Sequence, residues 1–199
     1  MGKCTSKQPA PPDKFETKYI ALRRIRERTN IMVVGSRGSG RGILSSKIKE
    51  ILGTLIGIRI QIFDTYTTTD KEILPAVNDA YVNGIKDKDS TNLVLHAVII
   101  AVDASKITVI SRLIKLFDSI KELLGPGIPI SIFFTRVDQR MIDYLCSVDS
   151  PIYERGRPPP IYYAEIVRPE QETPRKTLNY TIVSMIEDIV TRVHTPVPR

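Results

Sequence analysis

A glycine-rich stretch follows the first strongly apolar run of the chain. Residues 31–34 are apolar, and residues 35–42 read GSRGSGRG. Glycines allow main-chain N–H groups to approach an anion closely, and a helix that starts directly after the loop points the positive end of its dipole at the same place. Phosphate is the natural ligand of such a cluster of N–H groups. The sequence therefore predicts a phosphate-binding loop, whose candidate nucleotide-binding residues are Gly35, Ser36, Arg37, Gly38, Ser39, Gly40, Arg41 and Gly42.

Two positions of this loop depart from the usual pattern of Gly, four free positions, Gly, Lys and then Ser or Thr. Gly35 and Gly40 match the pattern, whereas Arg41 and Gly42 stand at its last two positions. Arg41 keeps a positive charge for the β and γ phosphates, but as a planar fork rather than a compact ammonium. Gly42 has no hydroxyl that could bind Mg²⁺. We therefore expect a loop that binds phosphate beside a weakened Mg²⁺ site.

Two other interpretations of the glycines stay open. A Gly/Ser-rich turn between a strand and a helix would need no ligand. A dinucleotide-binding fingerprint, Gly-x-Gly-x-x-Gly, would use the same residue type, but Ile43 or Ser45 stands at its third glycine, depending on where it starts. Asp64 follows the next predicted strand, as that fingerprint would require. The order of strand, loop and helix favours the phosphate-binding loop over both.

A second candidate element, Thr135-Arg136-Val137-Asp138, directly follows an apolar run at 128–134. With the glycine loop before it and Asp64 after an intervening strand, the order of motifs resembles that of the P-loop GTPases. The resemblance implies that Asp138 accepts hydrogen bonds from the amide edge of guanine while the stem of Arg136 covers the ring face. It also implies GTP or GDP as the nucleotide and Mg²⁺ held by Asp64 through water. A helix that begins at Asp138 would explain the same residues without a ligand.

The predicted strand that ends in Val102-Asp103-Ala104-Ser105 resembles one particular group within the P-loop GTPase superfamily. Over about residues 30–194 the chain is similar to the GTPase-like domain of interferon-induced protein 44-like proteins. Those proteins are linked to innate immune responses. Asp103 either contacts a ligand or caps the turn that follows it, and we favour the cap.

Three departures from the family pattern argue against efficient hydrolysis. In the pattern Asp-x-x-Gly the glycine amide touches the γ-phosphate, but Thr67 stands at that position. The predicted helix that ends near Gly53 runs almost directly into a strand at Ile56, which leaves no room for the usual switch loop. No glutamine that could orient water follows Thr67. Because phosphoryl transfer depends on positioning and charge compensation, we expect slow hydrolysis or none and assign no catalytic residue.

These observations favour a degenerate GTPase-like protein, a pseudo-GTPase that binds guanine nucleotide weakly or not at all. It would serve as a scaffold or switch for a protein that the sequence does not identify. Two other functions stay open: an active GTPase completed by dimerisation or by a partner, and a basic nucleic-acid-binding module. The nucleic-acid module is disfavoured because the basic segment lacks interleaved aromatic residues and a recognisable RNA- or DNA-binding motif.

The first six residues, Met1 to Ser6, match the N-myristoylation pattern, in which removal of Met1 exposes Gly2. A single myristoyl chain binds membranes only marginally, so stable anchoring needs a second signal. Cys4 would supply one if it were palmitoylated, and the basic N-terminal segment would supply another. Chance occurrence of Gly2 and Ser6 in a disordered tail is the alternative. We expect a lipid-anchored protein at the cytoplasmic face of an anionic membrane, and otherwise a cytoplasmic one.

The net charge of +7 is concentrated near the N-terminus. Residues 1–28 contain eight Lys or Arg and three Asp or Glu, and therefore carry +5. No run of about 18 apolar residues predicts a membrane span, and no apolar signal segment stands near the start. The two cysteines and two histidines have no metal-ligand spacing, which argues against a disulfide framework or a zinc site.

The elements that must position these residues alternate between strand and helix. Apolar runs predict strands at about 31–34, 56–63, 93–102, 128–134 and 161–167, and helical periodicity predicts helices at about 42–52, 71–84, 106–124, 139–146 and 174–194. This alternation predicts a three-layer α/β domain with a mostly parallel central sheet and helices on both faces. The resemblance to the P-loop GTPases implies that the domain is of the P-loop NTPase type. Ligands of such sheets bind beyond the carboxyl ends of the strands. The predicted organisation is a disordered acylated tail at 1–13, a basic amphipathic helix at 14–29 and a GTPase-like domain at 30–199.

Overall fold

A computed structural model of the chain describes residues 28–54, 59–65, 67–86, 92–105, 110–137, 143, 161–163 and 172–194. The predicted acylated tail, with Gly2 and Cys4, lies outside the described residues, as do Asp138 and nearly all of the two predicted helices at 14–29 and 139–146. The described elements, in chain order, are β1 (Thr29–Val34), α2 (Arg41–Gly53), β2 (Ile60–Asp64), the 3₁₀ helix η1 (Asp70–Glu72), α3 (Ile73–Val82), β3 (Ile85–Lys86), β4 (Asn92–Leu93), β5 (Ala97–Asp103), α4 (Ile110–Leu124), β6 (Ile130–Thr135), β7 (Ile161–Tyr163) and α6 (Glu172–His194).

A parallel sheet forms the centre of the molecule. Its five described strands lie in the order β2-β1-β5-β6-β7, and every neighbouring pair is parallel. In the register of the central strands, Val33 lies opposite Ile99 and Val98 opposite Ile130. Near-continuous apolar sequences suit these strands because a parallel sheet is covered on both faces. The prediction of a mostly parallel central sheet is confirmed.

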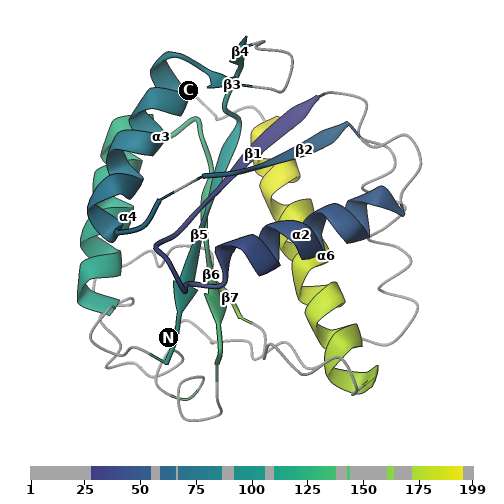
Figure 1. The fold of residues 1–199 in the computed structure, drawn as a ribbon. Helices are drawn as coiled ribbons and strands as arrows, with labels where there is room; N and C mark the ends of the chain where they lie inside the picture. The colour runs from purple at the N-terminus through teal and green to yellow at the C-terminus, as the bar shows by residue number, and fades with distance from the viewer. Residues whose placement is uncertain are drawn as a thin grey trace, which may run out of the picture.

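Helices cover both faces of this sheet (Figure 1). Side chains of successive strand residues point to opposite faces, so β1 and β5 each contribute to two cores. Met32 and Ile100 pack in the core that includes residues of α3 and α4, whereas Ile31 and Ile99 pack in the core that includes residues of α2 and α6. The predicted three-layer α/β architecture is therefore confirmed.

The predicted strand at 93–102 is two elements in the structure. β4 pairs antiparallel with β3 in a separate two-stranded sheet, and β5 begins only at Ala97. Side-chain hydrogen bonds bend the chain between them: Asn30 Nδ2 donates to the carbonyl of Val94 (2.9 Å), and Asn30 N donates to Nδ1 of His96 (3.1 Å). The apolar pattern does not reveal this break because Leu93 and Leu95 are both buried.

None of the helices in the described residues is long and apolar enough to cross a membrane.

Candidate functional site

The glycine loop joins the end of β1 to the start of α2, and two of its glycines are required by close packing. A Cβ at Gly35 would lie 2.6 Å from the carbonyl oxygen of Ala101 in β5, and a Cβ at Gly40 would lie 2.9 Å from Cγ2 of Thr135 in β6. Gly40 also has a φ of 80°, in the left-handed region that favours glycine. Any other residue at these positions would push the loop away from the sheet edge.

The first turn of α2 has no side-chain cap. Gly40 occupies the N-cap position without a side-chain hydrogen bond, and the first turn contains no acidic residue. The N–H groups at a helix start need partners, and the helix dipole makes an anion a suitable one. An uncapped helix start after a glycine loop is the backbone arrangement expected of a phosphate-binding loop, and phosphate binding here stays a prediction.

Arg41 lies across the loop with its guanidinium inside the molecule, where its side chain is 15% exposed. Its Nη1 donates to the carbonyl of Gly35 (2.9 Å), to the carbonyl of Thr67 (3.1 Å) and to the hydroxyl of Thr67 (2.9 Å). Its Nε lies 2.7 Å from Oδ1 of Asp64. The Nε–H is not aligned on this oxygen, so the contact is an ion pair rather than an oriented hydrogen bond.

Asp64 and Gly42 stand where the resemblance places the magnesium site. The Asp64 carboxylate is paired with Arg41, and a Cβ at Gly42 would lie 3.8 Å from Oδ2 of Asp64. The described residues contain no group of three or more His, Cys, Asp and Glu that could hold a metal ion. One carboxylate that already has a cationic partner, beside a glycine without a hydroxyl, does not fit Mg²⁺. The predicted role of Asp64 as a metal ligand stays a prediction, and this contact argues against it.

Thr67 connects the segment after β2 to the glycine loop through hydrogen bonds. It is 4% exposed, and its hydroxyl donates to the carbonyl of Gly35 (2.8 Å) while it accepts from Arg41. Arg37 N donates to the carbonyl of Thr68 (3.1 Å). In the sequence, Thr67 is notable only because the family pattern has a glycine at this position. Its hydroxyl bonds to a loop more than 25 residues earlier, and no local pattern predicts such a contact.

The element that begins at Thr135 also meets the loop. The buried Thr135 hydroxyl donates to the carbonyl of Ser39 (2.8 Å). Arg136 has a φ of 55°, and its Nη1 lies 3.0 Å from Oδ2 of Asp103, which is 5% exposed. Oδ1 of Asp103 accepts from N (3.0 Å) and Oγ (2.6 Å) of Ser105, as expected of a side chain that caps the following turn. Thr135 thus contacts the loop and Arg136 pairs with Asp103, while Asp138 lies outside the described residues.

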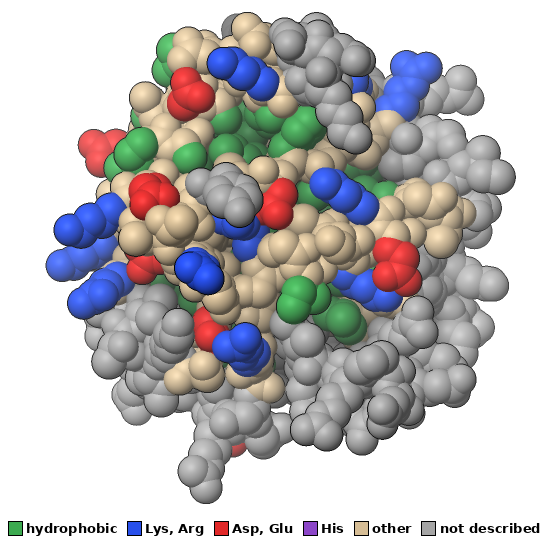
Figure 2. Space-filling model, viewed as in Figure 1, with side chains coloured by type: hydrophobic (Ala, Val, Ile, Leu, Met, Phe, Trp, Pro, Cys, Tyr) green, Lys and Arg blue, Asp and Glu red, His purple; other side chains and the backbone are tan. Residues whose placement is uncertain are grey.

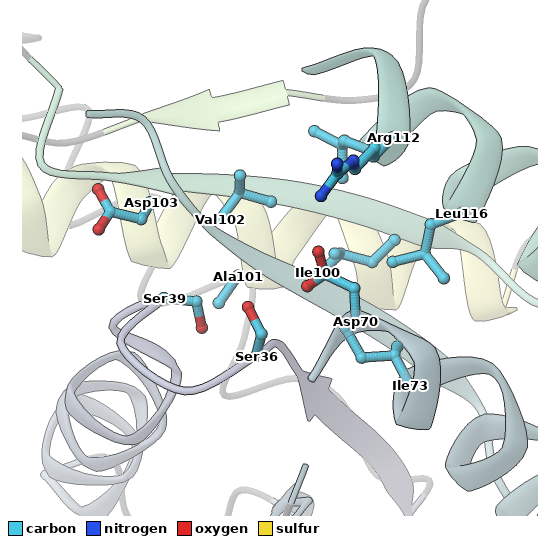
Figure 3. Close-up of a pocket in the computed structure, with 11 residues that line it drawn as sticks. Ser36, Ser39, Asp70, Ile73, Ile100, Ala101, Val102, Asp103, Arg112 and Leu116 are labelled. Carbon is cyan, nitrogen blue, oxygen red and sulfur yellow. The ribbon is translucent and has the colours of Figure 1, made fainter. Parts of the chain in front are cut away.

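A pocket of about 280 Å³ opens beside the loop, between β5, the η1–α3 segment and α4 (Figure 3). Figure 3 shows Ser36 and Ser39 of the loop on one side, with Asp70 and Arg112 from η1 and α4 on another. Ser39 Oγ is buried without a hydrogen-bond partner in the described part of the chain. The sequence does not predict this pocket because four separate elements supply its walls.

No family model matches the sequence, and no curated protein matches it significantly. Three solved structures show a likeness in fold. The signal recognition particle receptor SRb of Chaetomium thermophilum, with GDP and Mg, has a TM-score of 0.50 and 11% identity and covers 81% of this chain and 99% of that chain. The small COPII coat GTPase SAR1 of Encephalitozoon cuniculi in complex with GDP has a TM-score of 0.45 and 13% identity, and covers 86% of both chains. The cell division protein FtsY of Thermotoga maritima has a TM-score of 0.37 and 14% identity, covering 84% of this chain and 75% of that chain.

The likeness in fold to SRb agrees with the arrangement of the glycine loop at the edge of the parallel sheet. A glycine loop joins the first parallel strand to a helix, and the loop, Asp64 and Thr135 come together at the carboxyl ends of β1, β2 and β6. At 11% identity this likeness concerns the fold. The closer resemblance to interferon-induced protein 44-like domains stays a prediction. The chain has the fold of the P-loop GTPases.

Proposed function

We propose that the protein binds guanine nucleotide at the loop of residues 35–42 and acts as a scaffold or switch with little hydrolysis. The observation that carries the proposal is the fit of the loop against the sheet. Side chains at Gly35 and Gly40 would collide with Ala101 and Thr135, so both glycines hold the loop backbone in a cradle at the start of α2. A cationic side chain, Arg41, lies alongside this cradle. The uncapped helix start leaves main-chain N–H groups for an anion beside this cation.

Guanine is the base that we propose. Thr135 connects the candidate base-recognition element to the loop through the carbonyl of Ser39, so we expect the base of a nucleotide bound at the loop to lie on the side of this element. The likeness of the fold to a protein described with GDP supports this choice. Adenine would lack the amide edge that a carboxylate at Asp138 would recognise.

Little hydrolysis is proposed because the groups that would contact a γ-phosphate are absent or already bonded. Thr67 stands at the glycine of the Asp-x-x-Gly pattern, and its hydroxyl is bonded to Gly35 and Arg41. Asp64, at the first position of that pattern, is paired with Arg41. Phosphoryl transfer needs both a positioned water and compensation of the developing charge.

Titration with fluorescent GDP, GTP and ATP tests this proposal. We expect saturable binding of GDP and GTP and much weaker binding of ATP. Arg41→Ala should weaken GDP binding by about tenfold or more, because it removes a charge-assisted phosphate contact and leaves Asp64 facing the anion. The matched control is Lys47→Ala, which removes a cation from the same helix whose partner is Glu50 at the surface. Absence of saturable binding of any nucleotide would overturn the proposal, and rapid turnover would overturn its claim of little hydrolysis.

A further inference from the structure

We propose that the guanidinium of Arg41 takes the place of Mg²⁺ in this site, so that nucleotide phosphates bind without a divalent cation. The inference rests on the proposed nucleotide binding and specifies its chemistry. In a phosphate-binding loop a cation has to neutralise both the acidic side chain at the end of the second strand and the phosphates. In this protein Arg41, a residue of the loop itself, lies against that acidic side chain, Asp64.

The first argument is the pairing of Arg41 with Asp64. Nε lies 2.7 Å from Oδ1, and the two side chains are 15% and 33% exposed. Partial burial strengthens the attraction relative to an ion pair at the surface, since solvent screens it less. A carboxylate left unpaired at this position would repel phosphate. Arg41 therefore removes the repulsion that Mg²⁺ would otherwise have to remove.

The second argument is that the guanidinium is positioned before any ligand arrives. Nη1 is held by the carbonyl of Gly35 and by the carbonyl and hydroxyl of Thr67. Within the described residues Nη2 makes no hydrogen bond, so its two N–H groups remain for phosphate oxygens. A preorganised cation loses less conformational entropy when it binds an anion. One side chain thus neutralises Asp64 and offers hydrogen bonds to phosphate.

The third argument is that the remaining groups do not suit Mg²⁺. This ion requires a near-octahedral set of oxygen ligands. Gly42 contributes no side-chain oxygen, and Oδ1 of Asp64 is already in contact with Nε of Arg41 at 2.7 Å. An ion beside the guanidinium would also be repelled by it. The pairing of Arg41 with Asp64 therefore both disfavours binding of Mg²⁺ and removes the need for it.

The geometry indicates how a magnesium site could be introduced. A Cβ at Gly42 would lie 3.8 Å from Oδ2 of Asp64, in ordinary van der Waals contact, so a serine would fit there and bring its hydroxyl near the carboxylate. Arg41→Lys removes the fork that pairs with Asp64 and keeps the positive charge. The double variant Arg41→Lys/Gly42→Ser adds a hydroxyl oxygen beside Asp64 and removes the guanidinium from the Asp64 carboxylate.

The test measures GDP affinity by calorimetry in buffer with Mg²⁺ and in buffer with EDTA. The wild-type affinity should be the same within about twofold in the two buffers, whereas the double variant should bind about tenfold or more tightly with Mg²⁺. Electron paramagnetic resonance of added Mn²⁺ gives a second readout: GDP should retain Mn²⁺ on the double variant and not on the wild type. Gly53→Ser, at the end of α2 where an added Cβ meets no atom within 4 Å, is the control for a new hydroxyl on this helix away from Asp64.

The outcomes separate this inference from the proposed function. Wild-type binding that falls about tenfold in EDTA, or Mn²⁺ retained by the wild-type GDP complex, would overturn the replacement of the metal alone. Failure of the wild type to bind GDP in either buffer would overturn both proposals.

Discussion

At the residue scale, the site depends on a few side chains that bond to one another across the loop. Arg41, Asp64 and Thr67 join the start of α2, the end of β2 and the segment after it. Each satisfies a group that would otherwise be buried without a partner. Loss of one member should therefore affect both the stability of the loop and its readiness to bind an anion.

Thr67→Val tests this network. Valine has nearly the shape of threonine but cannot donate to the carbonyl of Gly35 or accept from Arg41. We expect the free energy of unfolding, measured with urea, to fall by about 1–2 kcal/mol because buried polar groups lose a partner. Thr69→Val is the matched control, since Thr69 is exposed and its hydroxyl donates only to Glu72. Equal effects of the two variants would contradict a structural role for the Thr67 hydroxyl.

His96 provides a pH-dependent contact at the opposite end of the sheet. Burial, and next the charge of His194 from α6, lower the pKa of His96 below its ordinary value of 6.5. Its Nδ1 accepts from Asn30 N, which requires an unprotonated nitrogen. The unfolded chain therefore binds a proton more readily than the native one, so this contribution to stability is complete above pH 6.5 and is lost as the pH falls below it.

The prediction is that the free energy of unfolding falls as the pH is lowered below about 6.5, and that His96→Gln has a smaller slope in this range. Urea titrations over this pH range measure both slopes. Parallel curves for the wild type and the variant would show that His96 contributes nothing to the dependence.

At the element scale, contacts with β5 and β6 hold the backbone of the glycine loop at the edge of the sheet. Gly38 and Gly40 both have left-handed φ values, 83° and 80°, but only Gly40 faces a close neighbour, Thr135. Backbone strain and steric exclusion can therefore be separated by substitution. Gly53 at the end of α2 has space around it and serves as a neutral reference.

Gly40→Ala should lower the free energy of unfolding by about 2–3 kcal/mol, because backbone strain adds to overpacking against Thr135. Gly38→Ala should lower it by about 1 kcal/mol, through backbone strain alone. Gly53→Ala should have no effect or a small stabilising one, since alanine favours the helix. Thermal and urea unfolding of the three variants give this ranking, and a Gly40→Ala protein as stable as Gly38→Ala would contradict the close packing.

At the scale of the whole molecule, basic character is concentrated in a short part of the chain. Of the net charge of +7, residues 1–28 carry +5. Figure 2 shows that lysine and arginine side chains on one face of the described part are interspersed with acidic ones. A basic N-terminal segment suits a tether to an anionic surface, and we keep lipid anchoring at Gly2 and Cys4 as a proposal from the sequence.

Gly2→Ala tests the tether. We expect protein isolated from its native cells to carry a myristoyl group and to float with vesicles that contain anionic lipid, and we expect the variant to remain in the dense fraction. Gly53→Ala, which leaves the N-terminus unchanged, is the control. Intact mass measures the modification directly. An unmodified N-terminus, or equal flotation of Gly2→Ala and wild type, would rule out a requirement for myristate.

Much of the fold could be predicted because its signals are local. The apolar runs around Val33, Ile99 and Ile132 indicate buried parallel strands, and the glycines that follow Val34 indicate a turn into a helix. Where a signal was not local the prediction was wrong: the apolar run at 93–102 contains a bend, because the side chain of Asn30 in another strand bonds to Val94.

The sequence by itself determined the glycine loop, the alternation of strand and helix and the departures at Arg41, Gly42 and Thr67, since these depend on residue type and on spacing along the chain. Only the tertiary structure shows that the side chains of Arg41 and Thr67 contact each other. Arg41 and Thr67 are 26 residues apart, and they meet with Asp64 only because β1 and β2 pair in parallel and end at the same edge of the sheet. That pairing places a guanidinium against the carboxylate to which the family resemblance assigns a metal ion, a contact that no local pattern encodes.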